Sequence, residues 1–303
     1  MTMLYCSLWL TAGSGSASPG MSPVEPQITT IFNDEDQLYT QFYAHEEKET
    51  VILLHGGPGF PTDLQNVVDY LWPNYQVISF HQRGTRQSPC LSHNYSMAAY
   101  LSDINRIAAH FKIDKFHLWG HSWGGLYAQI YAQTYPERLH SLFLCSPGSG
   151  TGEEWKQTEQ EVMQLNRAKS TSWAWIKMGV NSQLGKLGSD RAYQCLFKQV
   201  LSNYHQGFSA EKATATDLSL LRAEPINKTR PQIVKFPALI TPQKVDFPVT
   251  IIYGDQDIYG GSKNYVLNRY PQATVHSISH SGHIPWVHNP AEYKTVLADH
   301  FKP

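Results

Sequence analysis

Short apolar runs alternate with amphipathic stretches through the first half of this sequence, and this alternation constrains the fold more than any other feature. Val51–Leu54 and Leu139–Cys145 have the length and composition of buried strands. The apolar residues of Met97–Phe111 recur at helical spacing, and Trp123–Tyr135 has the same character. Further strands are expected at Gln27–Phe32, Gln37–Ala44, Tyr75–Phe80 and Lys115–Trp119. Strands that alternate with helices predict an α/β fold with a mostly parallel sheet and helices on both faces.

The alternation stops for about one hundred residues and then resumes. Residues 148–245 are polar and helical in pattern, and strand pattern returns at Pro248–Gly254 and Ala273–Ile278, before a closing helix at Pro290–His300. We therefore predict a core formed by residues 27–147 and 246–303, with a helical cap, residues 148–245, inserted after the sixth strand. Four prolines are expected to mark joints near the end of the cap, namely Pro225, Pro231, Pro237 and Pro242.

The charge balance narrows the class of partner. The 303 residues carry a net charge of −1. The chain therefore lacks the excess of positive charge that is typical of proteins that bind nucleic acid or anionic membranes. No apolar run approaches the roughly 20 residues that span a bilayer. We expect a small-molecule or short-peptide substrate, with no nucleic-acid and no membrane partner.

The cysteines and the N-terminal segment bear on the compartment. Cys6, Cys90, Cys145 and Cys195 are scattered, which favours reduced thiols and a cytoplasmic protein. Residues 1–26 are interpreted as a disordered tail or a leader. The apolar patch Leu4–Leu10 followed by small residues keeps secretion as the alternative, although the segment has no basic start.

The segment Gly120–Gly125, GHSWGG, has the G-x-S-x-G pattern between an expected strand and an expected helix. A nucleophile must stand on a sharp turn, and side chains at Gly120 and Gly124 would collide with neighbouring backbone. The helix that follows favours negative charge at its N-terminus. This context predicts Ser122 as a catalytic nucleophile.

A nucleophilic serine needs a base and an acid that orients the base, and in this architecture the acid precedes the histidine in the chain. Two carboxylates follow the strand after the cap, and Asp257 is preferred because it lies far enough along the loop to face a histidine, whereas Asp255 shapes the turn. His283 is the preferred base, and His280 and His288 are its rivals.

A metal site is the other reading of the histidines in this region. His276, His280, His283 and His288 lie close in sequence, but no cysteine or carboxylate stands beside them at ligand spacing. The chain also has no phosphate-binding glycine motif after any strand. We expect neither a metal nor a cofactor.

The segment His55–Gly59, HGGPG, follows a buried strand and is almost free of side chains. Acyl transfer develops an oxyanion that backbone N–H groups stabilise. One donor is expected from Trp123, the residue after the nucleophile, and the other from the loop after the third strand, where Gly57 is preferred. We interpret the shortage of side chains in this loop as room for its backbone N–H groups to contact the oxyanion.

These motifs together resemble the proline iminopeptidases of the α/β-hydrolase superfamily, over residues 27–301. The resemblance rests on HGGPG, HQRGTRQS, GHSWGG, GDQD and SGHIPWVHNP. It implies an α/β-hydrolase fold, a triad of Ser122, Asp257 and His283, oxyanion donors at Gly57 and Trp123, and removal of N-terminal proline from peptides.

The sequence departs from that family in two places. The loop after the fourth strand has His81 and Arg86 where the family has aspartate and glycine. In the cap, the family binds the substrate's ammonium through glutamates, one in a Trp-Glu pair, whereas Trp175 here precedes Ile176 and Lys177. Trp175 stays a predicted substrate-binding residue, with Glu153 and Glu154 as first candidates for the ammonium. Other candidates are Glu159, Glu161, Glu211 and Glu224.

Three functions follow from these observations. The first is a serine aminopeptidase that releases N-terminal proline or a similar residue through an acyl-enzyme. The second is an esterase or amidase for small uncharged acyl compounds, which an aromatic cap would suit. The third is a ligand-binding receptor on a hydrolase scaffold, because a fold does not fix a function. The complete triad favours the enzymes.

Overall fold

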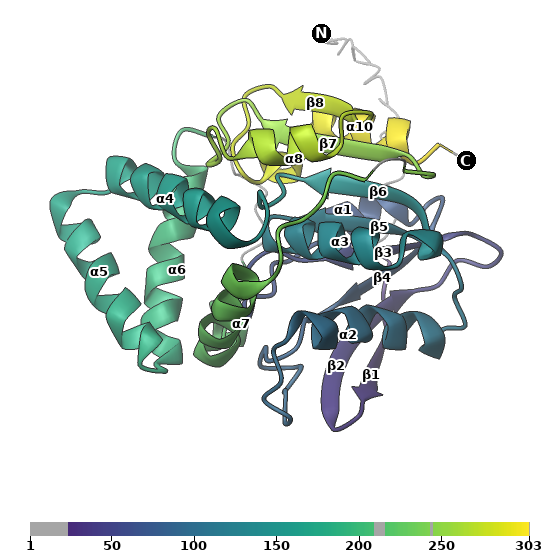
Figure 1. Ribbon diagram of the computed structural model, residues 1–303, viewed down its shortest axis with the longest axis horizontal. Coiled ribbons are helices and arrows are strands. Elements are labelled where there is room, and N and C mark those ends of the chain that lie inside the picture. The colour runs from purple at the N-terminus through teal and green to yellow at the C-terminus, as the bar shows by residue number, and fades with distance from the viewer. Residues whose placement is uncertain (1–23, 209–215, 243–244, 303) are drawn as a thin grey trace, which may run out of the picture.

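The computed structural model describes residues 24–208, 216–242 and 245–302, so most of the predicted tail, residues 1–26, lies outside the described residues. Its centre is a sheet of eight strands in the order β1-β2-β4-β3-β5-β6-β7-β8 (Figure 1). The pairs β1–β2 and β2–β4 are antiparallel, and every other neighbouring pair is parallel. The predicted mostly parallel α/β sheet is confirmed.

The elements have the following bounds. The strands are β1 (Gln27–Asn33), β2 (Asp36–Tyr43), β3 (Thr50–Leu54), β4 (Gln76–Phe80), β5 (Phe116–His121), β6 (Leu139–Cys145), β7 (Val249–Gly254) and β8 (Thr274–Ile278). The helices are α1 (Gln65–Leu71), α2 (Met97–His110), α3 (Trp123–Thr134), α4 (Gly152–Lys169), α5 (Ser172–Lys186), α6 (Asp190–His205), α7 (Ala223–Lys235), α8 (Lys263–Arg269), α9 (Pro285–His288) and α10 (Pro290–His300).

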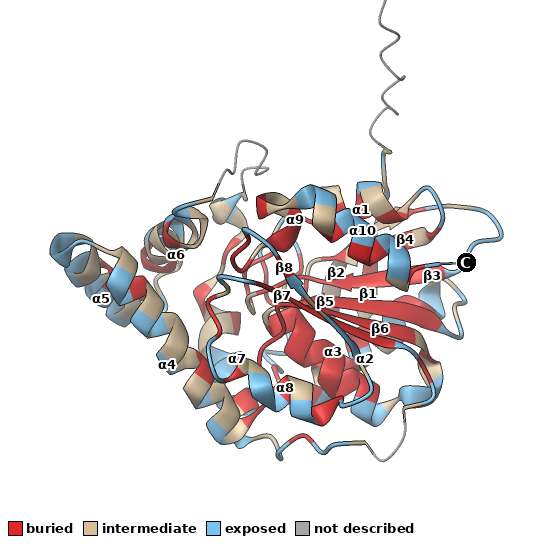
Figure 2. Cartoon of the chain, turned by 90° about the horizontal axis from the view of Figure 1, so that it is seen from above, coloured by how far each residue is buried: buried red, intermediate tan, exposed pale blue. Residues whose placement is uncertain are grey.

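The central strands are apolar at consecutive positions because the sheet is covered on both faces. Val51 and Leu53 of β3 pack into the apolar cluster beneath α1 and α10, whereas Ile52 and Leu54 pack into the cluster formed with α2 and α3. Figure 2 shows α1, α9 and α10 on one side of the sheet and α2, α3 and α8 on the other. Burial on both faces removes the polar alternation of a half-exposed strand.

Helices α4–α7 lie between β6 and β7, where the sequence places the cap. Two of the expected joints lie inside α7 instead. Pro225 is in the first turn of α7, where a missing N–H costs no helical hydrogen bond, and Pro231 is in its interior. The buried residues Thr229 and Ile233 on either side of Pro231 pack the helix into the protein. Packing of that face therefore overrides the local cost of the proline.

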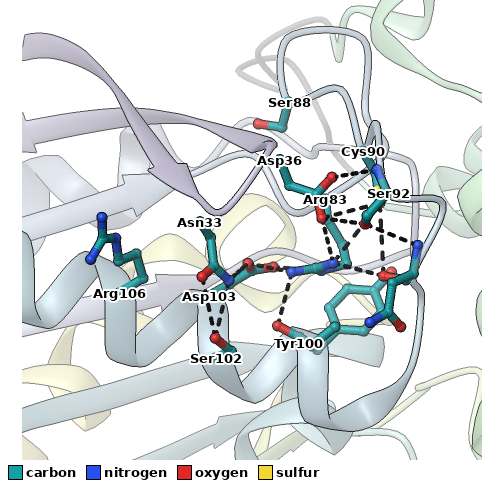
Figure 3. A network of polar contacts seen from close by, with 12 residues as sticks. Asn33, Asp36, Arg83, Ser88, Cys90, Ser92, Tyr100, Ser102, Asp103 and Arg106 are labelled. Atoms are coloured by element: carbon teal, nitrogen blue, oxygen red, sulfur yellow. Dashed lines mark hydrogen bonds and ion pairs between the residues drawn. The ribbon is translucent and has the colours of Figure 1, made fainter.

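The loop after β4 is fastened to the core by a buried guanidinium (Figure 3). Arg83 forms ion pairs with Asp36 at 3.0 Å and with Asp103 of α2 at 2.6 Å. It also donates to the carbonyl oxygens of Asn94 and Ala99. This charge is paired on both sides, which is the condition under which a buried arginine is tolerated. These contacts hold the loop to β2 and α2.

Candidate active site

Ser122 lies on the sharp turn between β5 and α3. Its backbone has φ 55° and ψ −119°, a strained conformation for a residue with a side chain. A Cβ at Gly124 would come within 2.2 Å of the carbonyl oxygen of Leu54, and one at Gly120 within 2.4 Å of that of Gly124. The turn therefore requires glycine at both positions, as the motif predicts, and it presents Ser122 at the carboxyl edge of the sheet.

The three residues predicted for catalysis form one hydrogen-bonded chain. Nε2 of His283 lies 3.0 Å from Oγ of Ser122, and Nδ1 of His283 lies 3.1 Å from Oδ1 of Asp257. Asp257 stands in the loop after β7 and His283 in the loop after β8, so the edge of the sheet brings them together. The side chains of His283 and Asp257 are 3% and 1% exposed. This arrangement suits proton transfer away from solvent.

The environment of Asp257 keeps its carboxylate ionised. Burial alone would raise its pKa, but the charge and hydrogen bond of His283, the hydroxyl of Ser146 and the N–H of Tyr259 together lower the pKa below its usual value. Ser146 donates to Oδ2 at 2.5 Å. Ser146 was not predicted, although its position directly after β6, at the same sheet edge, is a signal that could have found it.

The rivals for the acid and the base have other partners. Asp255 accepts hydrogen bonds from the N–H groups of His280 and Ser281, both at 3.0 Å, and so fixes the loop that carries His283. His280 is exposed, and His288 accepts the N–H of Gly282 through Nδ1. Among the described residues, no group of three or more histidine, cysteine, aspartate or glutamate side chains is placed to hold a metal ion.

The HGGPG loop lies against the nucleophile. A Cβ at Gly56 would come within 3.1 Å of Cβ of Ser122 and 2.8 Å of Nδ1 of His121, and Gly57 has φ +70°. Glycine is therefore needed at both positions, for space at the first and for backbone conformation at the second. Trp123 is the first residue of α3, and N–H groups of a first helical turn have no acceptor within their helix.

Gln82 links the two segments that carry the predicted oxyanion donors. Its side-chain amide donates to the carbonyl of His55 at 2.8 Å and accepts the indole N–H of Trp123 at 2.7 Å. Its backbone N–H donates to Nε2 of His55 at 3.0 Å. Burial lowers the pKa of His55 to about 3, so this ring stays neutral and Nε2 remains an acceptor. Gln82 was not predicted as part of the site.

Two tyrosines complete the surroundings of Ser122 and His283. The hydroxyl of Tyr259 lies 3.1 Å from Oγ of Ser122, and its ring lies edge-on to His283 with centroids 4.9 Å apart. The ring of Tyr204, on α6 of the cap, lies 5.3 Å from that of His283. Burial raises the pKa of Tyr259, so its hydroxyl stays protonated. When Ser122 donates its proton to Nε2 of His283, the hydroxyl of Tyr259 is the donor to Oγ.

The cap carboxylates do not lie as expected. Glu153 is 86% exposed and pairs with Lys156. Glu154 pairs with Arg269 at 2.6 Å, and Arg269 is buried, also donating to Gln129 and to the carbonyl of Ser149. This corrects the expectation that the pair offers a carboxylate to an ammonium: Glu153 points to solvent, and Glu154 neutralises a buried arginine.

The other candidate glutamates that the structure describes are also engaged. Glu161 accepts from the N–H groups of Gly260 and Ser262, at 2.8 and 3.0 Å, and fastens α4 to the loop after Tyr259. Glu159 forms a two-point ion pair with Arg230 of α7, and Glu224 bonds to His93. Glu211 lies outside the described residues. These contacts fasten the cap to itself and to the core.

Trp175 is on α5, and the guanidinium of Arg167 lies 5.6 Å from its ring centroid. It packs against the end of α4 there, which does not fit the prediction that it lines the substrate site. Two other cap aromatics lie beside residues of the site: the ring of Tyr204 faces that of His283, and the ring of Trp155 lies 6.4 Å from that of Trp123. The sequence spacing could not separate these aromatics, because all of them occur in helical stretches.

Comparison with known proteins decides the family. A model of the alpha/beta hydrolase fold family matches residues 49–290. The chain belongs to that family. No described helix is long and apolar enough to cross a membrane.

The chain is similar in sequence to two curated proteins named proline iminopeptidase, as the motifs predict. The one from Chitinophaga pinensis is 29% identical over 139 residues, which are 44% of this chain and 45% of that protein. The one from Arabidopsis thaliana is 30% identical over 128 residues, which are 41% of this chain and 33% of that protein. The similarity thus spans less than half of each relative.

In three dimensions the fold is shared more widely. A structure titled as one of the novel epoxide hydrolases from metagenomes of hot environments superposes with a TM-score of 0.67 at 19% identity. The match covers 90% of this chain and 97% of that one. At this identity the likeness concerns the fold, which includes proteins of different named activities.

Proposed function

We propose that this hydrolase is a serine hydrolase that cleaves an ester or amide bond through an acyl-enzyme on Ser122. The continuous Ser122–His283–Asp257 chain carries the proposal. Nε2 of His283 removes the proton as Oγ attacks the carbonyl carbon, and Asp257 holds the imidazole in the required tautomer. His283 then gives the proton to the leaving group. Water then attacks the acyl carbonyl carbon as His283 takes its proton, and His283 returns that proton to Oγ of Ser122 as the bond to the acyl group breaks and the acid leaves.

The oxyanion of each tetrahedral intermediate is assigned to the N–H groups of Gly57 and Trp123. The Gln82 bridge holds the two segments at a fixed separation. Tyr259 is assigned a positioning role, because its hydroxyl donates to Oγ and can fix the serine rotamer that faces His283. None of these steps needs a metal ion or a cofactor.

A fluorophosphonate probe tests the mechanism. Such a probe phosphonylates an activated serine, so we expect one modification per chain, mapped by mass spectrometry to Ser122. The Asp257→Asn variant is expected to react far more slowly, since its His283 is no longer oriented. Labelling at another serine would overturn the assignment of the nucleophile.

The first candidate substrate is a short peptide with N-terminal proline or a similar residue. It is supported by the two relatives named proline iminopeptidase and by the paired HGGPG and GHSWGG motifs. Such a substrate brings an ammonium group, which costs several kcal/mol to bury without a partner. This substrate therefore requires a carboxylate partner for its ammonium group. The partner is either a carboxylate other than the paired glutamates of the cap, or one of those glutamates after it leaves its present partner.

The second candidate is an ester or amide with an uncharged acyl group. A specific observation favours it: the five described candidate glutamates of the cap all have partners already. An acyl group without an ammonium needs no carboxylate. The aromatic side chains of Trp155, Tyr204 and Tyr259 around the catalytic residues suit such a group.

One matched set of substrates separates the candidates. It comprises proline p-nitroanilide, N-acetylproline p-nitroanilide and p-nitrophenyl butyrate, with Ser122→Ala as the blank. An aminopeptidase cleaves the first and rejects the second, whereas an uncharged-acyl hydrolase cleaves the acetylated compound or the ester at least as well. If the protein binds these compounds but turns over none of the three, the result would support the third function, a ligand-binding receptor.

The compartment is a separate proposal. Cys90, Cys145 and Cys195 are free, and the first two are buried. Free thiols support a reducing cytoplasm, as the scattered spacing indicates. Cell fractionation of the full chain, with a secreted marker alongside, tests this proposal against secretion.

A further inference from the structure

Helix α5 of the cap carries an apolar stripe on its exposed face. The stripe consists of Trp173, Ile176, Val180, Leu184 and Leu187, spaced by three, four, four and three residues. That spacing places all five on one side of the helix and its C-terminal cap. Their exposed fractions are 65%, 55%, 54%, 46% and 85%. A monomeric soluble protein rarely leaves such a row of large apolar side chains in water.

The stripe takes no part in the core of the cap. The residues of α5 that are buried, Met178 and Gly185, lie on another face of the helix, and Gly185 packs against the ring of Tyr193 on α6. Figures 1 and 2 place α5 at the end of the molecule furthest from the sheet. Other exposed apolar residues, such as Ile28 and Leu91, belong to separate strands and loops. The stripe is thus available to a partner.

The surroundings of the stripe are strongly basic. We define the distal cap as residues 162–208. It contains six basic residues and one acidic residue, a net charge of +5 in a chain whose total is −1. The acidic residue, Asp190, is paired with Arg222. Five of the six basic side chains are exposed, and the six are Arg167, Lys169, Lys177, Lys186, Arg191 and Lys198.

This charge decides between two occupants of the stripe. Two copies of α5 packed along the stripe would bring together two helices that each carry two lysines, Lys177 and Lys186, and no carboxylate to oppose them. An anionic lipid surface instead offers apolar chains to the stripe and phosphates to the lysines. Nζ of Lys177 lies 5.3 Å from the ring centroid of Trp173, so a cation and an indole stand together. An indole beside a cation is suited to the headgroup level of a bilayer.

We propose that the distal cap docks on anionic lipid surfaces, with α5 lying in the plane of the interface and its apolar stripe inserted among the lipid chains. The expectation of no membrane partner came from the net charge of the whole chain. That value hides the basic distal cap, because acidic residues elsewhere in the chain offset its charge. The proposal does not depend on the catalytic mechanism, because it concerns the outer face of the cap.

Vesicle flotation tests the proposal. The full chain is mixed with phosphatidylcholine vesicles that contain about 30% phosphatidylglycerol, and with vesicles of phosphatidylcholine alone, at about 0.1 M salt. We expect flotation with the anionic vesicles and much less with the neutral ones. The triple variant Ile176→Gln, Val180→Gln, Leu184→Gln should bind at least about tenfold more weakly, because apolar insertion supplies part of the affinity.

A matched control keeps the test specific. The variant Ile28→Gln, Phe32→Gln, Leu91→Gln replaces three apolar residues of similar exposure on the core, and it should float like the wild type. Lys177→Glu with Lys186→Glu should reduce binding and weaken its dependence on salt. No binding to anionic vesicles overturns the proposal, as does equal loss in the control variant. Dimerisation in sedimentation velocity that the stripe variant abolishes, without vesicle binding, would assign the stripe to a second copy.

Discussion

The carboxyl edge of the sheet and the helical cap use buried and half-buried carboxylates for different purposes. At the edge, Asp257 accepts from His283, Ser146 and Tyr259, and so orients a base. In the cap, Glu154 and Glu161 bind Arg269 and the N–H groups of the loop after Tyr259, and so hold α4 on the core. Both are charge-assisted contacts, but only the first leads to the proposed nucleophile.

This difference shows why residue type alone misleads in a cap. An aspartate in the loop after a strand of a parallel sheet has its position fixed by the sheet, since all strand ends meet at one edge. A glutamate on a cap helix faces whichever element packs against that helix, and the packing is decided elsewhere in the chain.

Ser122→Ala should cause the largest loss of activity among the changes at the carboxyl edge of the sheet. Removing the nucleophile is expected to lower kcat by about 10⁶-fold, or about 8 kcal/mol, leaving the background from binding and the oxyanion donors. Steady-state kinetics on whichever substrate is turned over by the wild type provides the measurement. Circular dichroism should show an unchanged fold, and retention of more than a few per cent of activity would contradict the assignment.

The two aspartates after β7 should differ sharply. Asp257→Asn is expected to lower kcat by about 10⁴-fold because the His283 tautomer is no longer fixed. Asp255→Asn should lower it by less than about tenfold, since Asp255 only holds the N–H groups of residues 280 and 281. The ratio of the two losses is the measurement. Equal losses, or the reverse order, would mean that the acid is misassigned.

Neighbouring glutamates of the cap should differ in stability rather than in chemistry. Glu154→Gln leaves the charge of Arg269 buried without its partner and should lower the free energy of unfolding by about 3 kcal/mol. Glu153→Gln removes an exposed pair and should change it by less than about 0.5 kcal/mol. Urea unfolding measures both. Unchanged stability in Glu154→Gln, together with a raised KM for free-amine substrates only, would return Glu154 to ammonium binding.

Acid should lower the stability that the neutral side chain of His55 contributes to the folded protein. The pKa of His55 is about 3 in the folded protein and about 6.5 in the unfolded chain, so between these values only the unfolded chain takes up the proton. Stability contributed by neutral His55 is therefore complete above pH 6.5 and falls by about 1.4 kcal/mol per unit as the pH drops below it. Urea unfolding gives the free energy of unfolding at pH 7.5 and at pH 5. The difference between these two values should be smaller in His55→Gln than in the wild type, by about 2 kcal/mol.

Tyr259→Phe should have the smallest effect. The change removes one neutral hydrogen bond to Oγ of Ser122, worth about 1 kcal/mol, so kcat should fall about fivefold with KM nearly constant. Tyr204→Phe serves as the control, because its ring packs on His283 while its hydroxyl bonds to Asn166. If Tyr259→Phe changes KM alone, the hydroxyl contacts substrate and does not position the serine.

Much of the core could be predicted because its signals are local. The strand β6 was expected at the bounds at which it occurs, and α2 ends one residue before its expected end. The short helices α1 and α8, of seven residues each, were not predicted, because seven residues show too little of a helical period. Pro231 was expected at a joint, and the buried face of α7 carried the helix through it.

The turn at Ser122 is encoded locally, because the backbone contacts at positions 120 and 124 leave room only for glycine. The sequence also determined the order of strands and helices, because apolar periodicity is written along the chain. Tertiary structure alone decided which glutamate meets which cation, which tyrosine reaches Oγ of Ser122 and that the apolar stripe of α5 faces water. These depend on contacts between residues far apart in sequence: Glu154 and Arg269 are 115 positions apart, and Ser122 and Tyr259 are 137. No local pattern records such a pairing, because only the packed helices and sheet bring its members together.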